Sequence, residues 1–311
     1  MATPYRHELL VHCYRMLGSI DDAEDAVQDA YVRAWHGRAT FRQAISFRAW
    51  LYRIATNACL DAIERRNRAR GANASIVIGP FPDADNGDGS DDLPGEMAAG
   101  PEARYDAHES ISLAFTTVLQ HLPPRQRSVL ILRDVLSWRA AEVAELLELS
   151  VPAVNSALHR ARTTMASQYR PMGAGGGAAA RHVTLEPGRL RALLERYVQA
   201  WEAADIPGLV ALLRDDAILA MPPTLAFEGR EAIAAFFADS IFVPGRQIRL
   251  VPVRANGGPG FAAFSRQSPS GPFTGFAVLL LEVDAAGVAR IDAFRDLRLI
   301  RRFGLPEALA A

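Results

Sequence analysis

Hydrophobic positions along the first 170 residues recur every three or four residues, the spacing of an α-helix that buries one face. Each apolar stripe ends at a break in the pattern, such as Gly18 after the first stripe, or Pro123 and Pro124 later in the chain. Apart from one long stretch without a period, this half of the chain is therefore predicted to be helical. The expected helices span residues 7–17, 22–35, 47–68, 110–121 and 125–136.

Residues 137–162 contain two short helical patterns separated by a break at residues 148–150. Ser150 is expected to cap the second helix, whose first turn tolerates Pro152. The outward positions of the second helix are polar and basic: Asn155, Ser156, His159, Arg160 and Arg162. This arrangement predicts a DNA-binding helix-turn-helix, although an ordinary helical hairpin with a solvated basic face has the same pattern.

The helix expected over residues 22–35 begins with a dense group of acids. Acidic side chains near a helix N-terminus are favoured by the helix dipole, so part of this pattern reflects stability. The acids in residues 21–29 are more numerous than capping requires. Their excess indicates a surface that is offered to a basic partner.

The helix expected over residues 47–68 interleaves aromatic, amide and arginine side chains, and residues 41–70 hold seven arginines against two acids. This combination suits stacking on unpaired bases together with neutralisation of phosphates. A buried helix with a solvated, arginine-rich end fits the same pattern.

Composition changes twice along the chain. Residues 71–109 are rich in Gly, Pro, Asp and Ala and lack a period, and residues 173–180 consist of Gly and Ala alone. Both segments are expected to be flexible linkers, the first of them acidic. After the second linker the pattern becomes helix, helix, strand, helix and then a meander of four strands, which predicts an α+β fold. The expected elements span residues 187–204, 205–213, 217–221, 231–241, 247–254, 260–267, 273–284 and 288–300.

The overall composition excludes few functions, and the positions of charged, cysteine and apolar residues along the chain say more. The formal net charge is −1, so any contact with nucleic acid must be local, and all 34 basic residues are Arg, which favours bidentate contacts. Cys13 and Cys59 lack metal-ligand spacing and are expected to be buried thiols, with no metal and no cofactor. The longest apolar run, residues 276–281, is too short for a membrane span, so the protein is expected to be soluble and cytoplasmic.

Three segments together resemble the extracytoplasmic-function (ECF) sigma factors, bacterial transcription initiation factors with one domain for the −10 promoter element and one for the −35 element. These segments are residues 21–35, 47–61 and 122–162, and the likeness covers about residues 4–170. The resemblance implies two all-α sigma domains, the second containing the helix-turn-helix. It also implies core RNA polymerase and promoter DNA as partners, and transcription regulation as the function.

The same resemblance implies roles for individual side chains. Core polymerase would be bound by Asp25, Gln28, Asp29 and Arg33. The −10 element would be bound by Trp50, Arg53, Asn57, Arg65 and Arg66. The −35 element would be bound by Asn155, Ser156, His159, Arg160 and Arg162. Since Asn suits adenine and Arg suits guanine, the placement of Asn155 in this helix indicates a −35 element unlike that of arginine-rich relatives.

The region beyond residue 187 resembles the SnoaL-like polyketide cyclases, whose cone-shaped α+β fold also serves ketosteroid isomerases. The likeness covers about residues 187–303 and is carried by Trp201, Asp205, the segment 221–223 and the pair Gly229-Arg230. The predicted domains are residues 1–70 for sigma region 2, 71–109 for the acidic linker, 110–170 for sigma region 4, 171–186 for the second linker and 187–311 for the SnoaL-like domain.

A cone-shaped fold implies a pocket. Alternation along the last strand places Asp292, Phe294 and Asp296 on one face and Arg295 on the other, and Asp205 is best explained as a helix cap. The candidate pocket residues are Trp201, Met221, Asp292, Phe294 and Asp296. Because no acids form an evident catalytic pair, no catalytic residue is expected, and binding of a small apolar ligand or docking within the chain is favoured.

The preferred hypothesis is a sigma factor whose C-terminal SnoaL-like domain regulates it in cis. One alternative is a one-component helix-turn-helix regulator with a ligand-binding domain, which leaves the acidic helix and the aromatic-basic helix unexplained. The other is a cyclase or isomerase joined to a DNA-binding module, in which Asp292 or Asp296 would be catalytic. The sequence does not identify an anti-sigma partner.

Overall fold

A computed structural model of the protein describes residues 3–38, 41, 46–70, 78–83, 112–168, 185–222 and 225–309. The chain divides into two compact units, one formed by the described residues up to 81 and from 112 to 168, the other by residues 82–83 and 185–309. Each unit has its own hydrophobic core. The first is helical and the second combines helices with a sheet, so the predicted fold class is confirmed.

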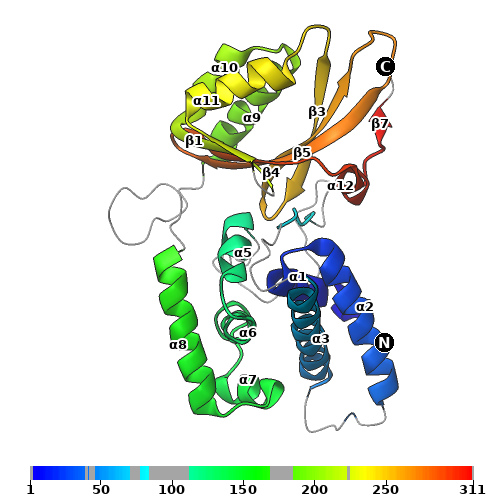
Figure 1. The fold of residues 1–311 in the computed structure, drawn as a ribbon, viewed down its shortest axis with the longest axis vertical. Coiled ribbons are helices and arrows are strands. Elements are labelled where there is room, and N and C mark those ends of the chain that lie inside the picture. Colours follow the sequence, from blue (N-terminus) through cyan, green and yellow to red (C-terminus); the bar gives the residue numbers. More distant parts are fainter. Residues whose placement is uncertain are drawn as a thin grey trace. The chain divides into compact units, whose positions relative to one another are not determined.

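The first unit contains only helices (Figure 1). They are the 3-10 turn Thr3–Tyr5, α1 (Arg6–Leu17), α2 (Ile20–Gly37), α3 (Phe47–Arg70), α5 (Leu113–Gln120), α6 (Pro124–Leu130), the π turn Ile131–Val135, α7 (Ala140–Leu147) and α8 (Val151–Gln168). The expected breaks are in place. Gly18 ends α1 in the left-handed conformation, and the Ser19 hydroxyl caps α2 by accepting the Asp22 N–H at 3.3 Å.

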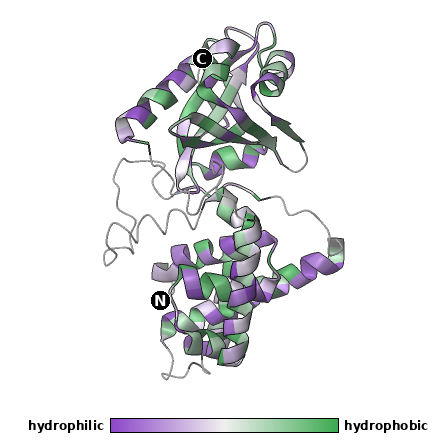
Figure 2. Cartoon of the chain, turned by 90° about the vertical axis from the view of Figure 1, so that its left-hand side faces the viewer, coloured by the Kyte–Doolittle hydropathy of each residue, from purple (hydrophilic) through white to green (hydrophobic). Residues whose placement is uncertain are grey.

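Helix α1 lies at the centre of this unit, and every residue from Leu9 to Leu17 is buried. Hydrophobic and hydrophilic residues alternate along the helices of this unit, drawn as green and purple stretches of the ribbon in Figure 2. The buried hydrophobic residues form one core. Cys13 and Cys59 are both buried free thiols, as predicted. A helix enclosed on all sides must bury its polar side chains too, and His12 is one of them.

His12 is expected to make the stability of this unit depend on pH. Its ring is fully buried, its Nε2 lies 2.9 Å from Thr56 Oγ1, and burial, helped by the charge of Arg15, lowers its pKa to about 3. The unfolded chain binds a proton near pH 6.5 and the folded chain does not, so stability falls as pH drops from about 6.5 towards 3. Between pH 7 and 5, urea titrations should show about 2 kcal/mol more loss for the parent than for His12→Asn. Equal losses would contradict a neutral, buried His12.

Residues 78–83 lie within the predicted linker, most of which falls outside the described residues. They are packed. In the first unit, the Tyr14 hydroxyl donates to the Gly79 carbonyl at 2.8 Å and the Phe81 ring lies 4.9 Å from the Tyr14 ring. In the second unit, Asp83 accepts the N–H of Gly257 at 3.1 Å.

The second unit joins a curved sheet to several helices (Figure 1). Its elements are α9 (Pro187–Glu202), α10 (Ile206–Leu212), β1 (Leu213–Met221), β2 (Leu225–Glu228), α11 (Arg230–Phe236), the π turn Phe237–Ile241, β3 (Gln247–Ala255), β4 (Gly258–Arg266), β5 (Phe273–Asp284), β6 (Gly287–Phe294), α12 (Leu297–Arg302) and β7 (Ala308–Leu309). Asp205 caps α10 by accepting the Gly208 N–H at 2.9 Å, as predicted.

The sheet has the order β2-β1-β6-β5-β4-β3, with β7 added beside β5. Two features differ from the predicted meander. First, β1 pairs with β6 in parallel, so the sheet is mixed. Second, the last strand ends at Phe294 and not at residue 300, because the Asp296 carboxylate accepts the Arg298 N–H at 3.0 Å and thereby starts α12.

Helices α9, α10 and α11 cover one face of the sheet, and their apolar side chains meet those of the strands in one core (Figure 1). Tyr197 and Trp201 of α9 are almost fully buried there, and the Tyr197 ring stacks on Phe261 of β4 at 5.6 Å. Among the described residues, no helix has the length and apolar character needed to cross a membrane.

Candidate promoter and polymerase interfaces

The outer face of α8 carries the side chains predicted to contact duplex DNA. Helix α7 ends at Glu148, which adopts the left-handed conformation, and the Ser150 hydroxyl then caps α8 by accepting the Ala153 N–H at 3.3 Å. Val154 and Ala157 are buried on the inner side of α8. The outer side exposes Asn155, Ser156, His159 and Arg160. An exposed polar face on the second helix of such a pair suits insertion into a major groove.

Arg162, the fifth residue predicted to contact the −35 element, differs from the other four because it forms an ion pair within the chain. Its guanidinium forms a bidentate pair with Asp134, with N–O distances of 2.7 and 2.9 Å. Asp134 belongs to the π turn that follows α6, so this pair fixes α8 to the preceding helices. The assignment of Arg162 to the −35 element stays a prediction, and in this structure its guanidinium is engaged with Asp134. Position 162 lies beside the exposed stripe of α8, on the flank that faces the π turn.

Helix α3 combines an aromatic cluster with exposed polar groups, as the sequence predicts. The Trp50 ring lies 5.2 Å from Phe41 and 5.7 Å from Phe47. Asn57 and Arg65 are exposed further along the helix. The inner side of this helix belongs to the core, and its outer side is polar. The structure therefore has features of both interpretations, a surface for unpaired bases and a buried helix with a solvated end.

The helix-turn-helix packs against this same part of α3. Arg53 of α3 forms an ion pair with Glu148, the residue that ends α7, and the Tyr52 ring lies 5.3 Å from Trp138. Asn57 lines a small cavity of about 150 Å³ together with residues 146–149 of α7 and its turn. Three groups of α3 thus contact the second half of this unit in the structure.

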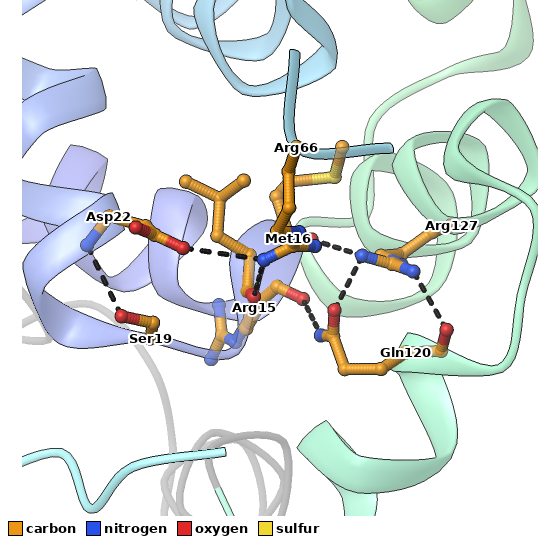
Figure 3. Close-up of polar contacts among 8 residues, drawn as sticks. Arg15, Met16, Ser19, Asp22, Arg66, Gln120 and Arg127 are labelled. Carbon is orange, nitrogen blue, oxygen red and sulfur yellow. Dashed lines mark hydrogen bonds and ion pairs between the residues drawn. The ribbon is translucent and has the colours of Figure 1, made fainter. Parts of the chain in front are cut away.

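A buried arginine joins the two halves of this unit more deeply (Figure 3). Arg127 of α6 is 2% exposed and donates to the main-chain carbonyls of Met16, Gln120 and Leu122 and to the Gln120 side chain. Burial, together with the nearby charge of Arg66, lowers its pKa to about 9. A charge this deep requires hydrogen-bond acceptors, and the carbonyl of Met16 at the end of α1 supplies one of them. Arg127 thereby ties α6 to α1.

Arg66, which the resemblance assigns to the −10 element, has partners within the chain, and that assignment stays a prediction. Its guanidinium donates to the Leu17 carbonyl and to the Asp22 carboxylate, both at 3.3 Å (Figure 3). Its side chain is only 16% exposed. Arg66 lies nine residues after Asn57, about two and a half helical turns, and so on the opposite side of α3. The two adjacent arginines therefore have different surroundings: Arg65 is exposed, and Arg66 contacts the end of α1 and the start of α2.

The outer face of α2 presents an acidic half and an apolar half. Asp25 and Gln28 are exposed, and the same face continues to Val32 and Trp35, which are 55% and 66% exposed. The spacing of three, four and three residues aligns these four side chains. Asp29 and Arg33 lie beside the stripe and form an ion pair with an N–O distance of 2.7 Å, and Arg33 also pairs with Asp61 of α3. Large exposed apolar side chains on a helix mark an interaction surface.

The second unit contains a cavity of about 190 Å³. The face of β6 that lines it is the opposite of the predicted one. Trp201 and Met221 line the cavity, as predicted. On β6, however, the lining side chains are Ile291, Ala293 and Arg295, in place of Asp292, Phe294 and Asp296. The assignment of these last three to the pocket is therefore wrong, because the opposite face of the strand faces the cavity.

The two acids of this strand have structural partners. Asp292 is 3% exposed and forms a bidentate pair with Arg290 at 2.8 Å. Burial raises the pKa of the Asp292 carboxyl, and the Arg290 guanidinium opposes that shift. Asp296 caps α12 and pairs with Arg298, which holds the pKa of its carboxyl below the usual range. Neither carboxylate faces the cavity.

Comparison with known proteins decides the family. Residues 1–69 match the family described as Sigma-70 region 2, residues 112–165 match Sigma-70, region 4, and residues 194–293 match the SnoaL-like domain. A protein of Mycobacterium tuberculosis named ECF RNA polymerase sigma factor SigG is 40% identical over 98% of this chain and 83% of its own length. The chain belongs to the extracytoplasmic-function sigma factors.

Some other ECF sigma factors are similar over about half of the chain, and one solved structure aligns along nearly all of it. SigW of Bacillus subtilis is 29% identical over 54% of this chain and 86% of its own length. The crystal structure of the Mycobacterium tuberculosis ECF sigma factor SigJ aligns over 98% of both chains with a TM-score of 0.60, at 22% identity. That likeness shows that the fold extends across the C-terminal region as well.

The region 2 match of this ECF sigma factor spans α1, α2 and α3, and the region 4 match spans α5 to α8. Val32 and Trp35 are the surface residues that the sequence interpretation missed. The signal was present, since both lie off the buried stripe formed by Ala23, Ala26 and Ala30. A large apolar side chain away from the buried face of an amphipathic helix is the pattern to look for.

Proposed function

We propose that this ECF sigma factor binds core RNA polymerase, directs initiation from a specific promoter, and is regulated in cis by its SnoaL-like domain. The observation that carries the first part is the pair of sigma regions on one chain, each exposing a surface of the required kind. Region 2 exposes the acidic and apolar stripe of α2, and region 4 exposes the polar face of α8. Core RNA polymerase is a cytoplasmic enzyme, so this activity belongs in the cytoplasm.

The contacts are proposed as follows. The polymerase surface on α2 includes Asp25 and Gln28 and is extended by Val32 and Trp35, with Asp29 and Arg33 at its edge. The −10 strand contacts Trp50, Arg53, Asn57 and Arg65 of α3, where aromatic rings and cations lie together. The −35 duplex contacts Asn155, Ser156, His159 and Arg160 of α8.

Reading the −10 element requires α7 to leave α3. Arg53 pairs with Glu148 in the free chain, so its guanidinium is not available to a phosphate there. The side chains of this pair are 37% and 72% exposed. Exposed ion pairs contribute about 0 to 1 kcal/mol, so polymerase and DNA can replace this contact at small cost.

The SnoaL-like domain is proposed to regulate and not to catalyse. Asp292 is held by Arg290 and Asp296 caps a helix, so neither is placed as an acid or base in the cavity. Relatives that match along nearly the whole chain are sigma factors, which supports a regulatory use of this domain.

Transcription by the full chain and by a variant that ends at Arg170 tests this proposal. Run-off transcription with purified core polymerase on fragments of the source genome should give specific starts with the full chain. Removal of the SnoaL-like domain should change the output at those promoters by at least about fivefold, the scale of a typical coupling between sites. Higher output identifies the domain as an inhibitor, and lower output identifies it as an activator.

Binding to core polymerase, measured separately, distinguishes two failures. A full chain that does not bind core polymerase contradicts the sigma activity itself. Full and shortened chains that bind and transcribe equally contradict regulation in cis while leaving the sigma activity intact.

A further inference from the structure

The cavity of the SnoaL-like domain is apolar along its walls. Alternate residues of two neighbouring strands face it, Ala277 and Leu279 on β5 and Ile291 and Ala293 on β6, and Trp201 of α9 closes one side. None of the described residues that line this cavity is acidic. Its volume of about 190 Å³ exceeds the roughly 150 Å³ that suffices for benzene in an engineered protein cavity. A hydrocarbon group of about seven carbons fits a cavity of this volume.

Two arginines belong to the same cavity. Arg246 directly precedes β3 and Arg295 directly follows β6, and both line the cavity. The antiparallel register through β4 and β5 brings the start of β3 and the end of β6 to the same end of the sheet. Burial, together with the charge of Arg295, lowers the pKa of Arg246. Two guanidinium groups of like charge thus lie at one end of the cavity.

In the described part of the chain, the groups that contact the Arg246 guanidinium are neutral. Its guanidinium lies 4.5 Å from the centre of the Phe276 ring and donates to the Ser265 hydroxyl at 3.2 Å. Phe276 falls at an irregularity of the β4–β5 register, where Ala277 pairs with Ala263 but Gly275 pairs with Phe264. Such a bulge redirects a side chain, and here the Phe276 ring lines the cavity together with Arg246.

Several other arginines of this domain have acidic partners. These pairs are Arg214 with Asp216 and Asp284, Arg230 with Asp215, Arg290 with Asp292, Arg298 with Asp296, and Arg301 with Glu307. Within the described part of the chain, neither Arg246 nor Arg295 forms an ion pair. Two uncompensated cations at an apolar cavity favour an anion, because an anion removes their repulsion and accepts charge-assisted hydrogen bonds from both.

We propose that this cavity binds an amphipathic carboxylate, with the apolar tail against Trp201 and the strands and the carboxylate between Arg246 and Arg295. The guanidinium fork matches the two oxygens of a carboxylate, and the apolar walls match a hydrocarbon chain or ring. The site is a feature of the SnoaL-like domain alone, so it does not depend on the proposed promoter activity.

Isothermal titration of the full chain with octanoate and with octan-1-ol, below micellar concentrations, tests the charge requirement. Octanoate should bind and octan-1-ol should bind at least about 10-fold more weakly. Arg246→Gln and Arg295→Gln should each weaken octanoate binding by about 10-fold or more while leaving octan-1-ol binding unchanged. Octan-1-ol binding as tightly as octanoate, or octanoate binding unaffected by both substitutions, would overturn the proposal.

Two further variants locate the binding. Arg249→Gln is the matched control, because Arg249 also lies 4.5 Å from a phenylalanine ring, that of Phe273, but does not line the cavity. It should bind octanoate like the parent. Ala293→Leu keeps both arginines and fills part of the cavity, so it should abolish octanoate binding, with thermal unfolding as the check of the fold. Full binding by Ala293→Leu would place the ligand on the surface and overturn the assignment.

Discussion

We expect the Trp35→Ala variant to bind core RNA polymerase about 30-fold more weakly than the parent chain, a loss of about 2 kcal/mol. Trp35 is 66% exposed at the end of the α2 stripe, and the Arg38 guanidinium lies 4.3 Å from the centre of its ring. One face of the ring is thus supported by Arg38. Tryptophans presented in this way are frequent centres of binding energy in protein interfaces.

The fold itself should tolerate this substitution. Trp35 contributes little to the core, so the free energy of unfolding should change by less than about 0.5 kcal/mol. Leu297→Ala is the matched control, because Leu297 is a large apolar side chain that is 46% exposed on α12 and belongs to the other unit. It should bind core polymerase like the parent.

Binding to immobilised core polymerase gives the measurement, and the acidic half of the stripe is tested beside the apolar half. Asp25→Lys should also weaken binding, since it reverses a charge that faces the partner. A Trp35→Ala variant that binds like the parent while Asp25→Lys does not would limit the interface to the acidic half and contradict the role given to Val32 and Trp35.

Local chemistry accounts for what the sequence predicted well. Helix spacing located the helices of region 2 and region 4, and the caps at Ser150 and Asp205 formed as expected because each involves a backbone N–H only three residues away. The exposed face of α8 followed in the same way, since Val154 fixes the buried side and the helical period then fixes the outer one.

The face of β6 could not be predicted from alternation. Both faces of this strand are buried, so apolar and polar positions do not alternate along it. A period of two separates Asp292 and Phe294 from Ile291 and Ala293, but it does not say which set faces the cavity. The curvature of the sheet and the position of the covering helices decide that, and neither is a local property.

Long-range contacts also decide the roles of individual arginines. Arg65 and Arg66 are adjacent in the sequence, yet only Arg66 contacts the end of α1 and the start of α2. The acceptors of Arg127 include the carbonyl of Met16, more than a hundred residues away. Main-chain carbonyls carry no side-chain signal, so a sequence cannot show which arginine will find them.

The second large effect is expected at Asn155. This side chain is exposed at the N-terminal end of α8, the part of a recognition helix that contacts base edges. A bidentate Asn–adenine contact contributes about 1 to 3 kcal/mol of discrimination, so Asn155→Ala should weaken binding of the polymerase complex to its promoter by roughly 30-fold.

Arg162→Ala is the comparison variant: it shows whether the loss at Asn155 comes from a base contact or from changing any exposed residue of α8. Arg162 lies on the same helix and is also solvent-accessible, but it pairs with Asp134, so its loss should weaken promoter binding by less than about threefold. The measurement is the affinity of the polymerase complex for the parent promoter and for promoters with single changes in the −35 element. Asn155→Ala should lose discrimination at one base pair and retain it at the others. If its affinity falls equally on every promoter, Asn155 contacts the phosphate backbone instead of a base, because phosphate contacts carry no sequence preference.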